Sequence, residues 1–190
     1  DRIAREVIQT EGRRARIIGN YGAGFEHIDL DAAREGGIAV TNTPDVLTDA
    51  TADIAMTLIL MATRRAGEGE RELCAGEWTG WRPTHLLGRS LRGKVLGLVG
   101  YGRIARAVAE RAKAFGLEIV VHSRSRADDV PEAAYHPTLE GLLRTADIVS
   151  LHAPGGAATR HMIDAATLAM MKREAVLVNT GRGTLVDEAA

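Results

Sequence analysis

One stretch of the chain, residues 94–126, constrains the fold more than any other. It reads KVLGLVGYGRIARAVAERAKAFGLEIVVHSRSR, in which an apolar run at 94–99 ends in glycines, apolar residues recur at helical spacing over 104–115, and a second apolar run covers 117–121. This order predicts a buried strand, a glycine turn, a helix and a second buried strand. Such a unit is typical of a parallel sheet that is covered by helices.

The glycine turn carries the pattern G-x-G-x-x-A at Gly100, Gly102 and Ala105. Gly100 permits a tight turn, Gly102 lets the backbone approach a pyrophosphate, and the small Ala105 allows close packing of helix on strand. The helix start favours phosphate because its first N–H groups have no partner within the helix. Glycine turns also occur in loops that bind nothing, but the flanking strand and helix here predict a dinucleotide site.

The end of the second strand indicates which dinucleotide would bind. An NAD-preferring site carries Asp or Glu there, whereas this chain has Ser123, Arg124 and Ser125, followed by Arg126. Arg124, with Arg126 as a second candidate, could bind a 2′-phosphate through a fork of charge-assisted hydrogen bonds, and the two serine hydroxyls could complete the site. We therefore predict NADP(H) as the preferred cofactor, with NAD(H) possible. The alternative is a solvated loop.

The composition allows a sizeable core and argues against several classes of partner. A chain of 190 residues with 45% hydrophobic residues can form one domain or one and a half. A net charge of −1 gives no reason to expect nucleic acid or an anionic membrane as partner. The single cysteine, Cys74, excludes an intrachain disulfide and a cysteine metal cluster. We accordingly predict no bound metal. Because the apolar stretch 54–62 is too short to span a bilayer, and a single cysteine is compatible with a reducing compartment, we predict a cytoplasmic protein.

Strands and helices alternate along the chain, which predicts an α/β fold with a doubly wound parallel sheet. Asp1 and Asp187 resemble helix caps close to the two ends, so we expect an internal segment of a longer polypeptide. The predicted strands cover 15–19, 38–41, 94–99, 117–121, 148–151 and 175–178, and the predicted helices cover 2–10, 31–36, 49–65, 104–115, 139–144 and 164–172.

The segment 66–93 is predicted to be an irregular linker because glycines recur throughout it. It contains both tryptophans, Trp78 and Trp81, which favours packing on something else, and a second subunit is one candidate. The helix preceding it, 49–65, has little polar face. That helix suits a position between two domains or at a subunit interface, and an ordinary core helix is the alternative.

Ligands of doubly wound sheets bind outside the carboxyl ends of the strands, where the loops 100–105, 152–156 and 179–183 should meet. Arg182, which stands between two glycines, could reach a substrate carboxylate or carbonyl there, or could simply form a surface turn. The glycine-rich loop 20–29 could hold a small anion on its N–H groups, or could be a plain turn.

Several motifs taken together resemble those of the D-isomer-specific 2-hydroxyacid dehydrogenases. The likeness covers essentially the whole chain, with the motifs in family order. Within the family, Trp78-x-x-Trp81-x-Pro83 and the Ser-Arg-Ser-Arg turn are most similar to the NADPH-dependent glyoxylate and hydroxypyruvate reductases. The shared motifs are Gly22-Ala23-Gly24-Phe25-Glu26-His27-Ile28-Asp29, Thr41-Asn42-Thr43-Pro44, Gly100-x-Gly102-Arg103-Ile104 and Asn179-x-x-Arg182-Gly183-x-x-Val186-Asp187.

The resemblance implies a two-domain enzyme, usually a homodimer, that transfers hydride from NADPH to a small 2-ketoacid such as glyoxylate or hydroxypyruvate. The product would be the D-2-hydroxyacid. Residues 1–45 would be part of a flavodoxin-like substrate domain, and 46–88 an interdomain helix with a linker or dimerisation segment. Residues 89–190 would be a Rossmann-type NADP-binding domain that is incomplete at its C-terminal end.

The resemblance also implies roles for individual residues. The N–H groups of Ala23 and Gly24 would hold the substrate carboxylate. Arg182 would be catalytic, binding the carboxylate and the ketone oxygen and polarising the carbonyl. The cofactor would be contacted by Gly100, Tyr101, Gly102, Arg103, Ile104, Ser123, Arg124, Ser125, His152, Pro154, Thr159, Thr180 and Gly181.

The general acid is where this chain departs from the family. In the family it is a His held by a Glu, both well beyond the position of Arg182, and all six histidines of this chain precede Arg182. A general acid is needed to protonate the forming alkoxide. The 190 residues alone are therefore expected to bind cofactor poorly or moderately and to reduce ketoacids hardly at all.

Two other readings of the chain stay open. One is an NAD-dependent relative of the D-3-phosphoglycerate or D-lactate dehydrogenase type, which Ser123 and Arg124 disfavour. The other is a dinucleotide-sensing protein of the corepressor type, which the presence of Arg182 mildly disfavours.

A smaller departure from the family is Gly181, which stands where Ser or Ala is more common.

Overall fold

The computed structural model describes residues 2–190, which form two compact units divided between Thr48 and Asp49. The predicted cap Asp1 lies outside the described residues.

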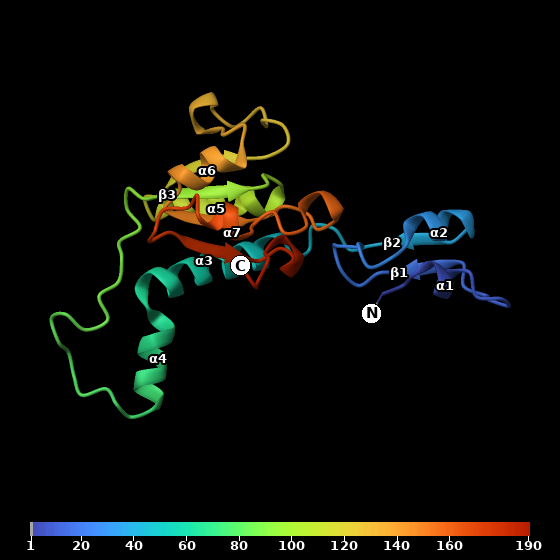
Figure 1. Ribbon diagram of the computed structural model, residues 1–190. Helices are drawn as coiled ribbons and strands as arrows, with labels where there is room; N and C mark the ends of the chain where they lie inside the picture. The colour runs from blue at the N-terminus through green and yellow to red at the C-terminus, as the bar shows by residue number, and fades with distance from the viewer. Residues whose placement is uncertain (1) are drawn as a thin grey trace. The chain divides into compact units, whose positions relative to one another are not determined.

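The first unit is a small parallel sheet with two helices (Figure 1). Its strands pair in parallel, with Ile17 opposite Ala39 and Gly19 opposite Thr41, and a short helix precedes each strand. Asp29 caps the second helix by accepting a hydrogen bond from the Ala32 N–H at 2.8 Å. The elements are α1 (Arg5–Ile8), β1 (Ile17–Gly19), α2 (Leu30–Glu35) and β2 (Ala39–Thr41), and the buried core is Ile8, Ile28, Ala32, Ala33 and Ile38.

The second unit is built on a four-stranded parallel sheet with the strand order β4-β3-β5-β6. The chain begins in the centre of the sheet at β3, moves outward to β4, and then crosses back to β5 and β6. This order reverses direction between β3 and β5, which is the doubly wound arrangement that the sequence predicts. The strands are β3 (Val95–Val99), β4 (Glu118–His122), β5 (Ile148–Leu151) and β6 (Val176–Asn179).

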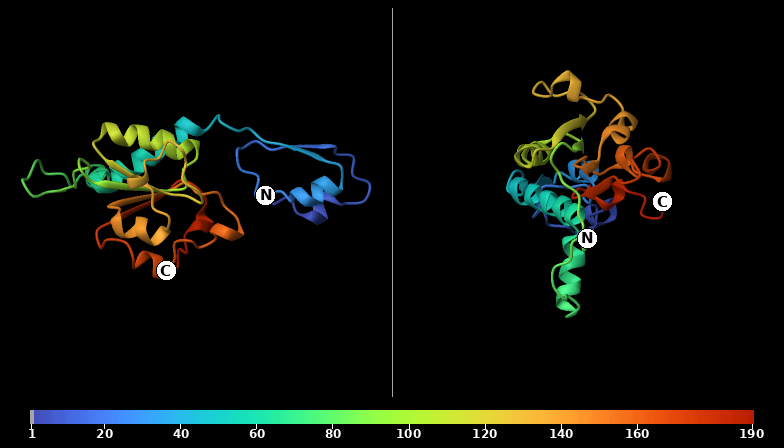
Figure 2. Two further views of the ribbon diagram at one scale, coloured as in Figure 1. Left: turned by 90° about the horizontal axis from the view of Figure 1, so that it is seen from above. Right: turned by 90° about the vertical axis from the view of Figure 1, so that its left-hand side faces the viewer.

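Helices cover both faces of this sheet, as the left view of Figure 2 shows. Successive residues of β3 point to opposite faces, so Leu96 and Leu98 pack on one side and Val99 on the other. A Cβ atom at Gly97 would lie 2.6 Å from a methyl group of Leu142, so the glycine lets a helix approach the sheet closely. One face carries α3 (Thr48–Arg64) and α5 (Arg103–Ala114), and the other carries α6 (Leu139–Thr145).

Three predictions of secondary structure are wrong. The segment 66–93 is not irregular throughout, because it begins with α4 (Ala66–Cys74), which follows α3 after a break at Arg65 with φ of 55°. Arg65 forms an ion pair with Glu68 in the first turn of α4. The helix predicted over 164–172 is shorter, at α7 (Ala165–Leu168), although Asp164 caps it through a capping box.

The helix α1 is likewise shorter than predicted, at Arg5–Ile8 in place of 2–10. None of the helices in the described part of the chain is long and apolar enough to cross a membrane.

Candidate dinucleotide-binding cleft

A cleft of about 570 Å³ opens in the second unit, where β3, β4 and β5 end. Its volume is within the range of small-molecule sites. The carboxyl ends of neighbouring parallel strands meet at one edge of a sheet, so the loops that follow them come together there. Most of the predicted cofactor contacts line the cleft, namely Gly100, Tyr101, Gly102, Ser123, Arg124, Ser125, His152, Pro154 and Thr159.

The start of α5 offers an anion site beside this cleft. Gly102 is the N-cap, no side chain of the described residues caps the helix, and its first turn contains no acidic residue. A Cβ atom at Gly102 would have nothing within 4 Å, so the backbone is open on that side of the N-cap. Arg103 and Ile104 are not among the lining residues, and they contribute backbone N–H groups in the first turn. This geometry fits a pyrophosphate.

Gly100 is required by two features of the turn. Its φ is +86°, a conformation that favours glycine, and an added Cβ atom would lie 2.8 Å from the Ala153 nitrogen and the His152 carbonyl carbon. The loop after β3 therefore passes directly against the loop after β5. This close approach joins two walls of the cleft.

The wall after β4 consists of polar and basic residues. The Ser123 hydroxyl donates to the Ser125 carbonyl oxygen at 2.7 Å, and the Tyr135 hydroxyl donates to the Ser123 carbonyl oxygen at 2.9 Å. Arg124 lines the cleft and is exposed. Among the described residues, those that line the cleft include no Asp or Glu. No carboxylate of the cleft would therefore repel a 2′-phosphate.

Arg106, which was not among the predicted site residues, connects this wall to the glycine turn. Its guanidinium lies 4.6 Å from the centre of the Tyr101 ring and forms an ion pair with Asp129. Arg106 lies on α5, Tyr101 in the glycine turn and Asp129 in the loop after β4. The spacing of Tyr101 and Arg106 contains no recognisable motif, so only the folded chain shows this contact.

His152 lies in the cleft with its ring partly buried. Its Nε2 atom lies 2.9 Å from the Ser150 hydroxyl oxygen, and Ser150 is fully buried in β5. Burial lowers the pKa of His152 to about 4, because a charged imidazolium would lose its hydration there. The ring is therefore neutral near pH 7 and cannot attract phosphate by charge.

The loop after β6 lies against the loop after β5. A Cβ atom at Gly155 would lie 3.0 Å from Cγ of Arg182, and one at Gly181 would lie 3.5 Å from the Ala153 carbonyl oxygen. The Thr180 hydroxyl oxygen is buried without a hydrogen-bond partner in the described residues. Such an orphaned polar atom fits a site that takes a polar ligand. The three predicted loops of the second unit thus meet.

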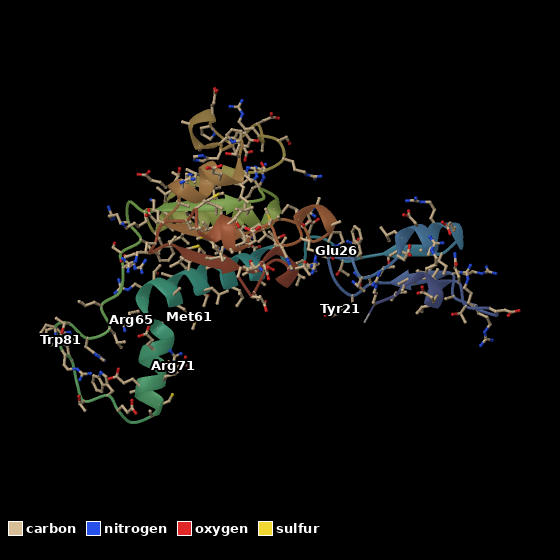
Figure 3. The ribbon with its side chains drawn as sticks, viewed as in Figure 1. Tyr21, Glu26, Met61, Arg65, Arg71 and Trp81 are labelled. Atoms are coloured by element: carbon tan, nitrogen blue, oxygen red, sulfur yellow. The ribbon has the colours of Figure 1, made fainter. Side chains whose placement is uncertain are left out.

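Ala23 and Gly24 belong to the first unit, in the loop after β1 that also carries Tyr21 (Figure 3). The structure brings the predicted contacts of the second unit together and describes these two residues within their own unit.

Several residues line the cleft that the sequence analysis did not assign. Most belong to a run of small residues after β5, and a sequence signal for them exists, because small residues at a strand end let a ligand approach the backbone. The described residues contain no cluster of three or more His, Cys, Asp or Glu that could hold a metal ion. The unassigned lining residues are Val99, His122, Ala127, Ala153, Gly155, Gly156, Ala157, Ala158 and Met162.

The parallel sheet, the glycine turn at a helix start and the cleft beside it define a Rossmann-type nucleotide-binding domain. Residues 56–190 match the family model described as the D-isomer specific 2-hydroxyacid dehydrogenase, NAD binding domain. The chain belongs to this family.

Named relatives are similar over nearly the whole chain. A glyoxylate reductase of Aeropyrum pernix is 47% identical over 100% of this chain and 58% of its own length. A glycerate dehydrogenase of Hyphomicrobium methylovorum is 41% identical over 98% of this chain and 59% of its own. The crystal structure of an NADPH-dependent glyoxylate/hydroxypyruvate reductase of Sinorhizobium meliloti, in complex with NADP and malonate, superposes with a TM-score of 0.84. The two sequences are 41% identical, and the superposition covers 92% of this chain and 54% of the reductase.

The chain therefore spans between about half and three fifths of the length of these relatives.

Proposed function

We propose that the whole protein reduces a small 2-ketoacid of the glyoxylate or hydroxypyruvate class to the D-2-hydroxyacid with NADPH. The observation that carries the cofactor choice is the wall after β4, where Ser123, Arg124 and Ser125 line a cleft without carboxylates. The substrate class is supported by the relatives named glyoxylate reductase.

The reaction consumes one hydride and one proton for each ketoacid. When bound, the nicotinamide cofactor supplies the hydride to the carbonyl carbon. The Arg182 guanidinium holds the substrate carboxylate and draws electron density toward the carbonyl oxygen, an effect that strengthens as negative charge develops there. The N–H groups of Ala23 and Gly24 bind the carboxylate. A general acid from outside these 190 residues protonates the oxygen.

A parallel titration of the whole protein with NADPH and NADH, followed by nicotinamide fluorescence, tests the cofactor choice. We expect NADPH to bind more tightly, and Arg124→Asp to weaken NADPH binding by about 10- to 100-fold, the equivalent of one lost charge-assisted interaction. The matched control is Arg126→Asp, which makes the same charge change at a residue that does not line the cleft. It should change the affinity by less than about threefold.

Equal or tighter binding of NADH by the unmodified protein would contradict the NADPH assignment and favour the NAD-dependent relatives of the D-3-phosphoglycerate or D-lactate type. Steady oxidation of NADPH with glyoxylate separates the enzyme from a dinucleotide-sensing corepressor, which would bind the cofactor without turnover.

We also propose that the protein is a cytoplasmic homodimer. Support for a dimer comes from α4 and the segment after it, where Trp78 and Trp81 are 55% and 82% exposed and Leu73 and Leu87 are also exposed. Figure 3 shows Trp81 on this segment. Exposed aromatic and aliphatic side chains of this kind are typical of a surface that another subunit covers.

A further inference from the structure

All three asparagines of the chain stand at the carboxyl ends of parallel strands. Asn20 follows β1, Asn42 follows β2, and Asn179 is the last residue of β6. In each case the side-chain amide donates a hydrogen bond to a backbone carbonyl of a loop. Two of the three, Asn20 and Asn42, donate to carbonyl oxygens of the same loop, residues 20–24.

The carbonyl groups of this loop are bound by the two amides. Asn20 donates from Nδ2 to the carbonyl oxygens of Gly22 at 3.0 Å and Gly24 at 2.8 Å. Asn42 donates from Nδ2 to the carbonyl oxygen of Ala23 at 2.8 Å. The carbonyls of three successive residues are therefore held by side chains.

The strand register explains why the two asparagines meet. Gly19 and Thr41 are partners in the parallel pair of β1 and β2, so the residues that follow them lie side by side. The Asn20 N–H extends the ladder by donating to the Thr41 carbonyl oxygen at 2.8 Å. Both amides thus start from the same edge of the sheet.

Peptide geometry links the direction of each carbonyl to that of the next N–H group. In a trans peptide the carbonyl of one residue and the N–H of the next share a plane and point in opposite directions. The Gly22 carbonyl shares its peptide with the Ala23 N–H, and the Ala23 carbonyl shares its peptide with the Gly24 N–H. Holding these carbonyls with Asn20 and Asn42 therefore aims both N–H groups away from the two amides.

The N–H groups of Ala23 and Gly24 make no hydrogen bond within the described part of the chain. We propose that Asn20 and Asn42 are positioning residues that present these two N–H groups to the carboxylate of the substrate. This inference rests on the proposed function, which assigns the carboxylate to Ala23 and Gly24.

The proposal explains why an amide is needed at both positions. Asp has nearly the same shape as Asn, but its carboxylate cannot donate to a carbonyl oxygen and would repel it. Its negative charge would also oppose a bound carboxylate nearby. Both asparagines are only partly buried, so the Asp variants are expected to fold.

The test uses Asn20→Asp and Asn42→Asp in the whole protein, with two readouts. The first is the KM for glyoxylate at saturating NADPH, together with the Kd of NADPH. The second is the NMR shift of the Ala23 and Gly24 amides on titration with oxamate, an unreactive analogue of a 2-ketoacid. The matched control is Gln9→Glu, which makes the same amide-to-carboxylate change at an exposed residue of the first unit.

We expect each Asp variant to raise the KM at least about tenfold, to leave the Kd of NADPH within about twofold, and to abolish the oxamate shifts. The control should keep the KM and the shifts. A role limited to stability would lower the melting temperature and leave both readouts of the folded protein unchanged, which overturns the inference.

The result for the unmodified protein distinguishes a failure of the proposed substrate site from a failure of the positioning role of the asparagines. If its Ala23 and Gly24 amides do not respond to oxamate, the proposed substrate site is wrong, and the inference falls with it. If they respond equally in the unmodified protein and in both Asp variants, only the positioning role is overturned.

Discussion

The cleft of the second unit and the loop 20–24 of the first unit both follow the carboxyl ends of parallel strands, but they are held in different ways. The cleft borders a sheet with buried cores on both faces. The loop follows a two-stranded sheet with a small core, and amide hydrogen bonds from Asn20 and Asn42 hold it. Packing therefore shapes the cleft, whereas a few polar contacts shape the loop.

This difference decides how each region should respond to substitution. In the cleft, added volume at a closely packed backbone position should disturb stability and binding together. In the loop, loss of one hydrogen bond should change binding while most of the fold persists. The Asn20 and Asn42 variants described above test the loop, and the following predictions test the cleft and the rest of the first unit, beginning with the largest effect.

Gly100→Ala should have the largest effect. The added Cβ atom would meet the backbone of His152 and Ala153 at 2.8 Å, and φ of +86° is unfavourable for alanine. We expect a loss of about 2–4 kcal/mol in the free energy of unfolding and more than about 100-fold weaker NADPH binding. Urea unfolding and nicotinamide fluorescence measure these two quantities.

Gly102→Ala is the matched control, because its Cβ atom would have nothing within 4 Å. It should cost less than about 1 kcal/mol of stability but still weaken NADPH binding, since the methyl group would occupy the space in front of α5. Native stability of Gly100→Ala would contradict the close packing of the two loops.

His152 should give the second unit a pH-dependent stability. Its pKa is lowered from 6.5 to about 4 by burial, so the unfolded chain takes up a proton near pH 6.5 and the folded protein only near pH 4. Above pH 6.5 the ring is neutral in both states, and the free energy of unfolding is unaffected. As the pH falls from 6.5 toward 4, the free energy of unfolding decreases by about 3 kcal/mol, because only the unfolded chain gains the proton.

Urea unfolding between pH 4 and 7.5 should therefore show a shallower dependence on pH for His152→Gln than for the unmodified protein. Parallel curves for the two proteins would mean that the ring is solvated in the native state.

Asp29→Ala should have the smallest effect of the three and should be confined to the first unit. It removes the side chain that caps α2 through the Ala32 N–H, which costs about 1 kcal/mol. Hydrogen exchange of the Ala32 and Ala33 amides should become about fivefold faster, with NADPH affinity unchanged. Asp31→Asn, at an exposed position of the same turn, should change exchange less. A loss of NADPH affinity in Asp29→Ala would show that the two units are not independent.

The sheet of the second unit could be predicted from the sequence, and each predicted strand lies within a residue or two of an observed one. Long apolar runs between glycines leave few alternatives. Helix α4 could not be predicted in this way. Its glycines Gly67 and Gly69 are typical of a linker, whereas in the structure an ion pair between Arg65 and Glu68 accompanies the first turn of the helix.

Most predicted residues of the cleft could be found from the sequence, because they lie within the first few residues after a predicted strand; Thr159, in a short 3-10 helix further along the loop after β5, is the exception. Contacts between distant side chains could not be predicted from the sequence. An example is Arg106, which contacts Tyr101 and Asp129. These depend on distances that only the folded chain sets. The roles assigned to Ala23, Gly24 and Arg182 stay predictions.

The position of the tryptophans has an optical consequence. The chain contains two, Trp78 and Trp81, and both lie in the exposed segment after α4, away from the lining of the cleft. Indole emission from these 190 residues will therefore describe the environment of that segment, and the buried cores of the two described units will contribute none of it. A change in wavelength with protein concentration would register burial of that one surface, which makes the segment a native spectroscopic probe.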